Sequence, residues 1–134
     1  MNAVDTSVVI AAFASWHEGH ERAAEVLALG VRLPAHCALE CYSVLTRLPP
    51  PHRVAGELAR DFVLSRFTEP LLTVDPADHL ALLDQLVTKA ISGGAAYDGL
   101  VALTAARHGA HLFSRDHRAA RVYEVLEVEF ELIA

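Results

Sequence analysis

The stretch AVDTSVVIAAF, residues 3–13, holds one carboxylate, Asp5, in a run that is otherwise apolar or small. Burying a carboxylate among apolar residues costs free energy unless the charge has a partner. The pattern favours a short strand over residues 3–5 and a helix that begins at Ser7. Asp5 is therefore expected where the first strand ends, and the rest of the chain has to supply whatever pairs with it.

Strand-like and helical segments alternate along the chain, which predicts an α/β fold. Further strands are expected at residues 31–33, 71–74, 110–114 and 129–133. Helices are expected at residues 17–30, 34–48, 53–67, 76–91, 97–109 and 117–126. Such alternation implies one domain over residues 1–134, with a central, mainly parallel five-stranded sheet between helices. Ligands of open parallel sheets bind at the carboxyl ends of the strands.

Composition narrows the class of protein. The chain has 134 residues, of which 53 % are hydrophobic. A chain of this size can bury a stable core without disulfide bonds or a structural metal ion. No apolar segment reaches the roughly 18 residues of a transmembrane helix, and no basic segment precedes the first apolar run as in a signal peptide. We therefore expect a cytoplasmic protein with no membrane partner. Cys37 and Cys41, four apart on one helix, are expected to be small core residues rather than a disulfide or a zinc site.

Four carboxylates are predicted to meet near one edge of the sheet. Asp5 and Asp116 each follow a strand, and Asp98 lies in the first turn of the helix that leads into the strand before Asp116. Glu40 lies in the middle of a largely apolar helix, on a polar stripe. That stripe also carries His36, Ser43 and Arg47. Singly, each acid has an ordinary interpretation as a helix cap, a partner of a helix dipole or a solvated residue, but together they favour a binding site.

Carboxylates that converge repel one another. At an effective dielectric constant near 20, one pair about 4 Å apart costs about 4 kcal/mol. A divalent cation with a preference for oxygen ligands, such as Mg²⁺ or Mn²⁺, removes that penalty. Such an ion also lowers the pKa of a bound water and stabilises charge on a phosphoryl group, which directs attention to phosphoryl chemistry.

Four segments resemble the successive motifs of PIN-domain ribonucleases, and most of all the VapC toxins of bacterial toxin–antitoxin pairs. They are VDTSVVIAAF (4–13), ALECYSVLTRLP (38–49), GGAAYDGLVALTAARHGAHLFSRD (93–116) and FELI (130–133). The resemblance implies a PIN-like α/β/α sandwich and a metal-dependent endoribonuclease that uses Mg²⁺ or Mn²⁺. It also implies a homodimer, and a cognate antitoxin whose C-terminal segment lies in a groove near the active site.

The resemblance also assigns residues. The catalytic acids of the family correspond to Asp5, Glu40, Asp98 and Asp116, and the metal ligands to Asp5, Asp98 and Asp116. The hydroxyl that follows the first acid is Thr6. The hydroxyl two residues before the last acid, usually Thr in the family, is Ser114. On this interpretation, a cation is the partner of Asp5.

The net charge of −6 argues against a nucleic-acid partner at first sight. Seventeen acidic residues less the four of the site leaves 13 against 11 basic residues, a net charge of only −2. Arg47, Arg115 and Arg118 are expected to contact RNA phosphates, because they lie beside the site acids in the sequence. Of the eight histidines, only His36 and His117 are expected near the site.

Three other classes compete with this interpretation. A receiver domain needs a lysine after its last strands, and Lys89 precedes the Gly93 turn instead. A haloacid-dehalogenase-type phosphatase needs a second Asp two residues after the first, where this chain has Ser7. A PIN-like domain that only binds a partner or RNA, without catalysis, stays open as the alternative.

The helix expected at residues 53–67 carries more apolar positions than one stripe requires. Val54, Leu58 and Phe62 recur at helical spacing, and Val63 and Phe67 widen the apolar face. Part of this face is expected to pack on the sheet. The excess predicts a surface that a second chain covers.

Overall fold

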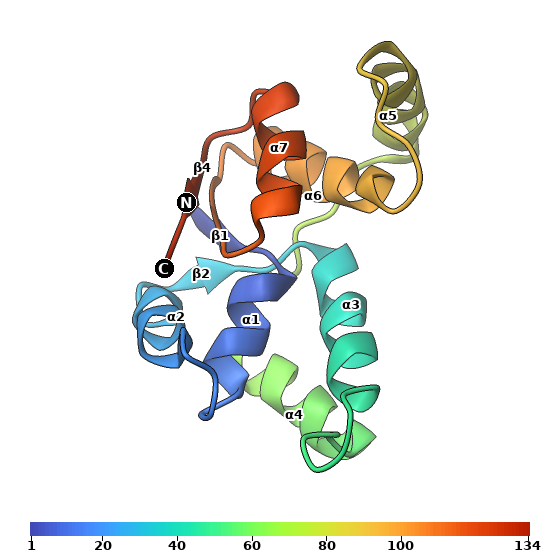
Figure 1. Cartoon of the computed structure of the whole chain (residues 1–134). Coiled ribbons are helices and arrows are strands. Elements are labelled where there is room, and N and C mark those ends of the chain that lie inside the picture. Colours follow the sequence, from blue (N-terminus) through green and yellow to red (C-terminus); the bar gives the residue numbers. More distant parts are fainter.

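In the computed structural model, which describes residues 1–134, the sheet lies between two groups of helices (Figure 1). Its strands are β1 (Asn2–Val4), β2 (Val31–Arg32), β3 (His111–Ser114) and β4 (Phe130–Leu132). They run in the order β2-β1-β3-β4, and every pairing is parallel. The register places Ala3 of β1 opposite Arg32 on one side and Leu112 on the other. The predicted α/β sandwich with a parallel sheet is confirmed.

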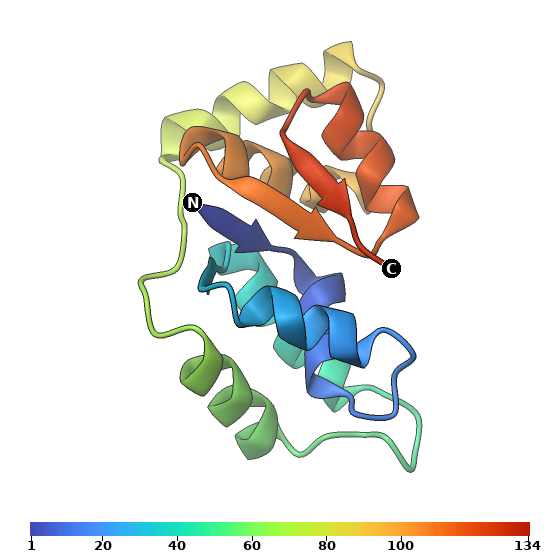
Figure 2. The same ribbon diagram turned by 90° about the vertical axis from the view of Figure 1, so that its left-hand side faces the viewer.

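Seven helices cover the two faces of the sheet. They are α1 (Thr6–Phe13), α2 (His20–Leu27), α3 (Ala35–Thr46), α4 (Gly56–Arg66), α5 (Pro76–Thr88), α6 (Ala95–Arg107) and α7 (His117–Val125). Figure 2 shows α1 to α4 on one side of the sheet and α5 to α7 on the other. Each lies in a segment for which the sequence predicted a helix, because prolines, glycines and capping carboxylates mark the ends.

The fifth strand predicted at residues 71–74 does not form. Leu72 makes a single isolated bridge to Pro34, in which the Leu72 N–H donates to Leu33 O and the Ala35 N–H donates to Leu72 O. The ladder stops there because β2 is only two residues long and Pro34 already caps α3. A proline also has no N–H with which to continue a ladder. The sheet therefore has four strands.

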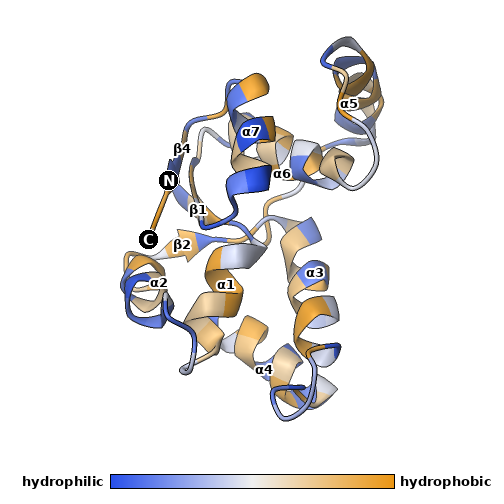
Figure 3. Cartoon of the chain, viewed as in Figure 1, coloured by the Kyte–Doolittle hydropathy of each residue, from blue (hydrophilic) through white to orange (hydrophobic).

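One large core of 25 buried residues fills both layers. β1 lies at its centre, with Ala3 and Val4 fully buried, as expected for an inner strand of a parallel sheet. Cys37 and Cys41 belong to this core and are free thiols, as predicted. Figure 3 shows apolar residues on α1, α4 and α5 as well as in the sheet. None of the helices is long and apolar enough to cross a bilayer.

Helix α5 packs mainly on α6 and projects from the rest of the molecule (Figure 1). Leu82 and Leu86 of α5 form a small second core with Leu103 of α6. Gly99 permits this contact, since a Cβ at that position would lie 2.9 Å from Cδ2 of Leu86. The opposite side of α5 is left uncovered by the chain.

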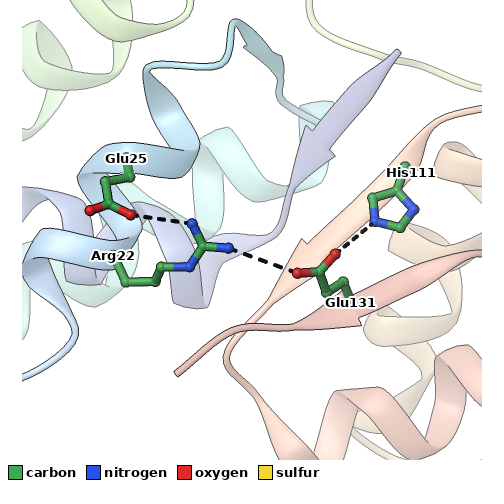
Figure 4. Close-up of polar contacts among 4 residues, drawn as sticks. All are labelled: Arg22, Glu25, His111 and Glu131. Atoms are coloured by element: carbon green, nitrogen blue, oxygen red, sulfur yellow. Dashed lines mark hydrogen bonds and ion pairs between the residues drawn. The ribbon is translucent and has the colours of Figure 1, made fainter.

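A chain of polar contacts joins α2 to the two last strands (Figure 4). Arg22 lies 3.3 Å from Glu25 and 3.8 Å from Glu131 of β4, and Glu131 lies 3.4 Å from Nε2 of His111 on β3. All four side chains are partly exposed, and exposed ion pairs contribute about 0–1 kcal/mol each. The network orients the edge of the sheet but adds little to its stability.

Phe62 of α4, predicted to belong to the excess apolar face, is half-buried within its own chain. Its ring packs edge-to-face on Phe13 of α1, with ring centroids 4.9 Å apart, and the Arg66 guanidinium lies 5.5 Å from its centroid. The uncovered apolar side chains of α4 are instead Leu58 and Leu64. Phe62 thus joins α4 to α1.

We expect Phe62→Ala to lower the free energy of unfolding by about 2 kcal/mol, because it removes an aromatic contact and leaves a cavity. Leu58→Ala, on the exposed side of the same helix, should change it by less than about 0.5 kcal/mol. Urea unfolding monitored by circular dichroism measures both values. Equal losses in the two variants would show that Phe62 does not pack within the monomer.

Candidate functional site

Asp5 is 4 % exposed and caps α1 at the carboxyl end of β1. Its Oδ1 accepts hydrogen bonds from the backbone N–H of Ser7, at 3.0 Å, and from the Ser7 hydroxyl. Its Oδ2 accepts one from the Tyr123 hydroxyl of α7, at 2.8 Å. The partners that the sequence left undefined are therefore, within the chain, three donors from two helices.

Burial nevertheless dominates the ionisation of Asp5. Desolvation raises the pKa of Asp5 above its ordinary value, although the nearby hydroxyls of Ser114, Ser7 and Tyr123 oppose the shift. Burial and the charge of Asp5 also raise the pKa of the Tyr123 phenol, so that Tyr123 remains a donor. A cation close to this buried carboxyl group would favour its ionised form.

The loop between β3 and α7 is joined to Asp5 through hydroxyls. Ser7 Oγ accepts a hydrogen bond from the Arg115 N–H at 2.8 Å and lies 3.5 Å from Ser114 Oγ. Ser114 is fully buried and accepts from the Asp116 N–H at 3.0 Å. Asp116 in turn caps α7 by accepting from the N–H groups of Arg118 and Ala119. Asp116 is thus fixed relative to Asp5, although the two are far apart in sequence.

Asp98 and Glu40 complete the acidic group from α6 and α3. Asp98 is half-buried, and desolvation raises its pKa to about 6, with further contributions from the charges of Asp116, Glu40 and Asp5. Glu40 Oε2 lies 3.3 Å from Nε2 of His36, one turn earlier on α3. The charges of the other three acids therefore act on Asp98, as their predicted convergence requires.

All four acids line one cavity of about 570 Å³, which we call the acidic cavity. The three predicted arginines, Arg47, Arg115 and Arg118, also line this cavity. His117 lines it as well. Thr6 lines it too, and its buried Oγ1 has no hydrogen-bond partner in the chain. The structure therefore brings together the acids, the hydroxyls and the arginines that the sequence singled out.

The arginines differ in how they are held. Arg47 donates to Ser43 Oγ at 2.8 Å from the exposed C-terminal end of α3. Arg115 donates to the Ala134 carbonyl and lies 3.3 Å from Nε2 of His17. Its guanidinium lies against Gly19, where a Cβ would approach it to 2.5 Å. Arg118 is exposed at the start of α7 and is the least constrained of the three.

Three residues of the site were missed in the sequence. Ser7 and Tyr123 bind the Asp5 carboxylate, and His17 lines the cavity beside Arg115. Ser7 could have been found, since a hydroxyl two residues after a helix-capping Asp is placed to bond it. Tyr123 had no local signal, because its partner lies 118 residues away in the chain.

The oxygen atoms that line the cavity suit a hard divalent cation. They are the oxygens of the four carboxylates and the Thr6 hydroxyl, which has no hydrogen-bond partner in the chain. In the conformation described, no three of the Asp, Glu, His and Cys side chains are close enough to bind a single ion. The neighbouring thiols are not ligands of choice, because burial raises the pKa of Cys41 to about 12 and that of Cys37 well above its ordinary value.

Comparison with known proteins points to one family. The PIN domain model matches residues 3–125, a span that includes all four acids. Ribonuclease VapC40 of Mycobacterium tuberculosis is 49 % identical over 133 residues, covering 99 % of both chains. Ribonuclease VapC27 of the same organism is 42 % identical over 137 residues, covering 98 % of this chain and 96 % of the relative.

A solved structure supports the fold independently. The crystal structure of FitAcB from Neisseria gonorrhoeae superposes with a TM-score of 0.70, covering 97 % of this chain and 96 % of that chain. The sequences are 20 % identical. At that identity the likeness bears on the architecture alone.

The raised pKa of Asp98 has a consequence for stability. A carboxyl whose pKa is higher in the folded state than in the unfolded state favours folding when protonated, so its contribution is lost as pH rises from about 4 through about 6. We expect Asp98→Asn to raise the free energy of unfolding at pH 7.5 by about 1–2 kcal/mol, a value discounted because the side chain is half-exposed. The gain should vanish below about pH 4. Urea titrations at several pH values measure it, with Asp84→Asn, at an exposed position of α5, as the control.

Proposed function

The chain belongs to the PIN domain family and to its VapC group, and on that premise we propose that it is a metal-dependent endoribonuclease, the toxin of a toxin–antitoxin pair. The observation that carries this proposal is the convergence of Asp5, Glu40, Asp98 and Asp116 on one cavity. Arginines at the same cavity suit a polyanionic substrate. The proposed reaction is hydrolysis of an RNA phosphodiester bond, and the site of action is the cytoplasm.

We propose Asp5, Asp98 and Asp116 as the residues that hold Mg²⁺ or Mn²⁺, with Glu40 beside them. When bound, such an ion would lower the pKa of water and stabilise charge on the phosphoryl group. Support comes from the pKa of Asp98, which burial raises first and the charges of Asp116, Glu40 and Asp5 raise further, so that a cation would relieve the repulsive part. The partnerless Oγ1 of Thr6 is a further oxygen available to the same cavity.

The other residues of the site orient and bind. Ser7 and Tyr123 hold both oxygens of Asp5 in place, and Ser114 fixes the turn that presents Asp116. Arg47, Arg115 and Arg118 are proposed to bind phosphates on either side of the bond to be cut. Arg118 is the strongest candidate, because its guanidinium has no partner within the chain that competes for it.

Substitution of the acids tests the proposal. Asp5→Asn and Asp98→Asn should each abolish cleavage of RNA in Mg²⁺ or Mn²⁺ while the protein stays folded. Millimolar metal should raise the melting temperature of the wild type, because binding to the native state stabilises it by mass action, and should raise that of Asp98→Asn much less. Asp84→Asn, remote from the cavity, should behave as the wild type in both measurements.

Two results would count against the proposal. Equal metal stabilisation of the wild type and Asp98→Asn would rule out a shared metal site. A wild-type protein that binds RNA tightly, yet cleaves none in either metal, would support the alternative of a non-catalytic binding domain.

An apolar groove between α3 and α4 is proposed as the antitoxin site. It has a volume of about 530 Å³ and lies beside the helix that carries Glu40. Its apolar lining includes Leu39, Tyr42, Val63 and Leu64, and Leu39 is 72 % exposed. A segment seated in this groove would place its basic residues within reach of the acidic cavity, which would explain inhibition by exclusion of RNA.

The uncovered side of α5 is proposed as the homodimer contact. Leu80, Leu83 and Val87 form one exposed stripe at helical spacing, and Val87 is 81 % exposed. This stripe, unlike Phe62, is an apolar surface that nothing in the chain covers. A second copy related by a two-fold axis would bury the same stripe on both chains.

The two surfaces predict opposite outcomes for a matched pair of variants. Leu83→Glu should convert a dimer into a monomer in light scattering at tens of micromolar, while inhibition by the antitoxin is retained. Leu39→Glu should leave the dimer intact and abolish inhibition by the proposed cognate antitoxin. A clean monomer for the wild type would refute the α5 contact, and full inhibition of Leu39→Glu would refute the groove.

A further inference from the structure

The hydrogen bonds to Asp5 leave little of its carboxylate free for a further ligand. Each carboxylate oxygen can accept about two hydrogen bonds, one for each lone pair. Oδ1 of Asp5 accepts two, from the backbone N–H and from the hydroxyl of Ser7. Oδ2 accepts one, from the Tyr123 hydroxyl at 2.8 Å. The lone pair that remains on Asp5 therefore belongs to Oδ2, the oxygen that Tyr123 contacts.

Asp116, the other proposed ligand that caps a helix, is less constrained than Asp5. Its Oδ1 accepts both of its hydrogen bonds, from the N–H groups of Arg118 and Ala119. Its Oδ2 accepts none from the chain and keeps its full capacity for a ligand. Asp5 is thus the acid whose capacity to bind a cation is limited by the residues around it.

The ring of Tyr123 is held by the core, so its hydroxyl has a fixed position. Tyr123 is 1 % exposed, belongs to the main core and lines the acidic cavity. Its ring packs edge-to-face on Phe130 of β4, with centroids 5.7 Å apart and planes inclined by 65°. Side chains of a helix point toward its N-terminus, so Tyr123 reaches back along α7 to the end of the sheet where Asp5 lies. A phenylalanine would fill the same space, and only the hydroxyl serves the bond to Asp5.

A carboxylate with one free lone pair can bind a cation through one oxygen only. Mg²⁺ demands near-ideal octahedral geometry and is usually bound by one or two carboxylates together with water. Ca²⁺ takes about 6–8 oxygens in a flexible arrangement and often binds both oxygens of one carboxylate. An Asp5 that offers one lone pair in one fixed direction therefore suits the smaller ion and is a poor ligand for the larger one.

We propose that Tyr123 is a positioning residue that sets the cation selectivity of the acidic cavity. Its hydroxyl fixes the direction of the lone pair that Asp5 offers, while Ser7 occupies the other oxygen of Asp5. The cavity thereby favours Mg²⁺ or Mn²⁺ over Ca²⁺. This inference rests on the metal site of the proposed function and adds the residue that decides which divalent cation the site accepts.

Tyr123→Phe tests this role, because it removes the hydroxyl and keeps the ring that packs on Phe130. The full chain is titrated with Mg²⁺, Mn²⁺ and Ca²⁺ in the absence of RNA, and the rise in melting temperature gives the dissociation constant of each ion. We expect Tyr123→Phe to bind Mg²⁺ and Mn²⁺ about 10–100-fold more weakly, the usual effect of removing a residue that orients a metal ligand. The affinity for Ca²⁺ should change little, because the flexible coordination of Ca²⁺ tolerates a carboxylate whose direction varies.

Tyr42→Phe is the matched control, because it removes the same hydroxyl from a tyrosine that does not line the acidic cavity. Its affinities for the three ions should equal those of the wild type. If the Tyr123 hydroxyl merely stabilised the fold, Tyr123→Phe would melt at a lower temperature without ions, and the ratio of its Mg²⁺ and Ca²⁺ affinities would stay at the wild-type value. The ratio is therefore the quantity that only a positioning role changes.

The wild type supplies a second measurement, which decides the matter even if Tyr123→Phe does not fold. In a crystal structure of the wild type with bound Mn²⁺, we expect Asp5 to contact the ion through Oδ2 alone. The Tyr123 hydroxyl should keep its hydrogen bond to the same oxygen. Contact through Oδ1, contact through both oxygens, or loss of the Tyr123 hydrogen bond would overturn the proposal.

The outcomes also separate this role from the proposed function. Equal ratios of Mg²⁺ and Ca²⁺ affinity in the wild type and Tyr123→Phe would overturn the positioning role alone if the wild type cleaves RNA. A ratio that falls by about tenfold, in a protein whose wild type cleaves no RNA, would support the positioning role and refute the ribonuclease. A wild type that binds none of the three ions would refute the positioning role together with the metal site.

Discussion

The buried carboxylate of Asp5 is the constraint on which the rest of the structure depends. An ionised group with 4 % exposure has lost most of its hydration, and the chain replaces it with donors from α1 and α7. Those donors lie far apart in sequence, so satisfying Asp5 draws the first and last helices of the domain together at the end of the sheet. The burial of one charge thereby sets the geometry of the β3–α7 turn and the position of Asp116.

The four acids of the site repel one another. Four carboxylates share one cavity, and burial together with the charges of the other three raises the pKa of Asp98. Charges that destabilise the fold by themselves are retained where binding needs them, which is the usual trade between stability and function at active sites. The surrounding core is apolar. The hydroxyls of Ser7, Ser114 and Tyr123 hold Asp5 and Asp116 in place by hydrogen bonds that do not neutralise their charge.

The outer surfaces divide the molecule by role. Apolar side chains left uncovered gather on α5 and in the groove between α3 and α4, on opposite sides of the sheet. The acidic cavity is lined instead by carboxylates, arginines and histidines. The apolar surfaces and the acidic cavity are formed by different residues, although α3 contributes to both the groove and the cavity.

Much of this protein can be predicted from its sequence by itself. The alternation of strand and helix, the parallel sheet and the four acids follow from local patterns, because periodicity, capping residues and the order of elements are properties of neighbouring residues. The buried, unpaired cysteines follow from the same reasoning. Only the tertiary structure decided that residues 71–74 make one bridge instead of a strand, that Phe62 packs on Phe13, and that Tyr123 binds Asp5. Each of these depends on which distant segment lies alongside, and contacts between segments remote in sequence leave no periodic signal in either one.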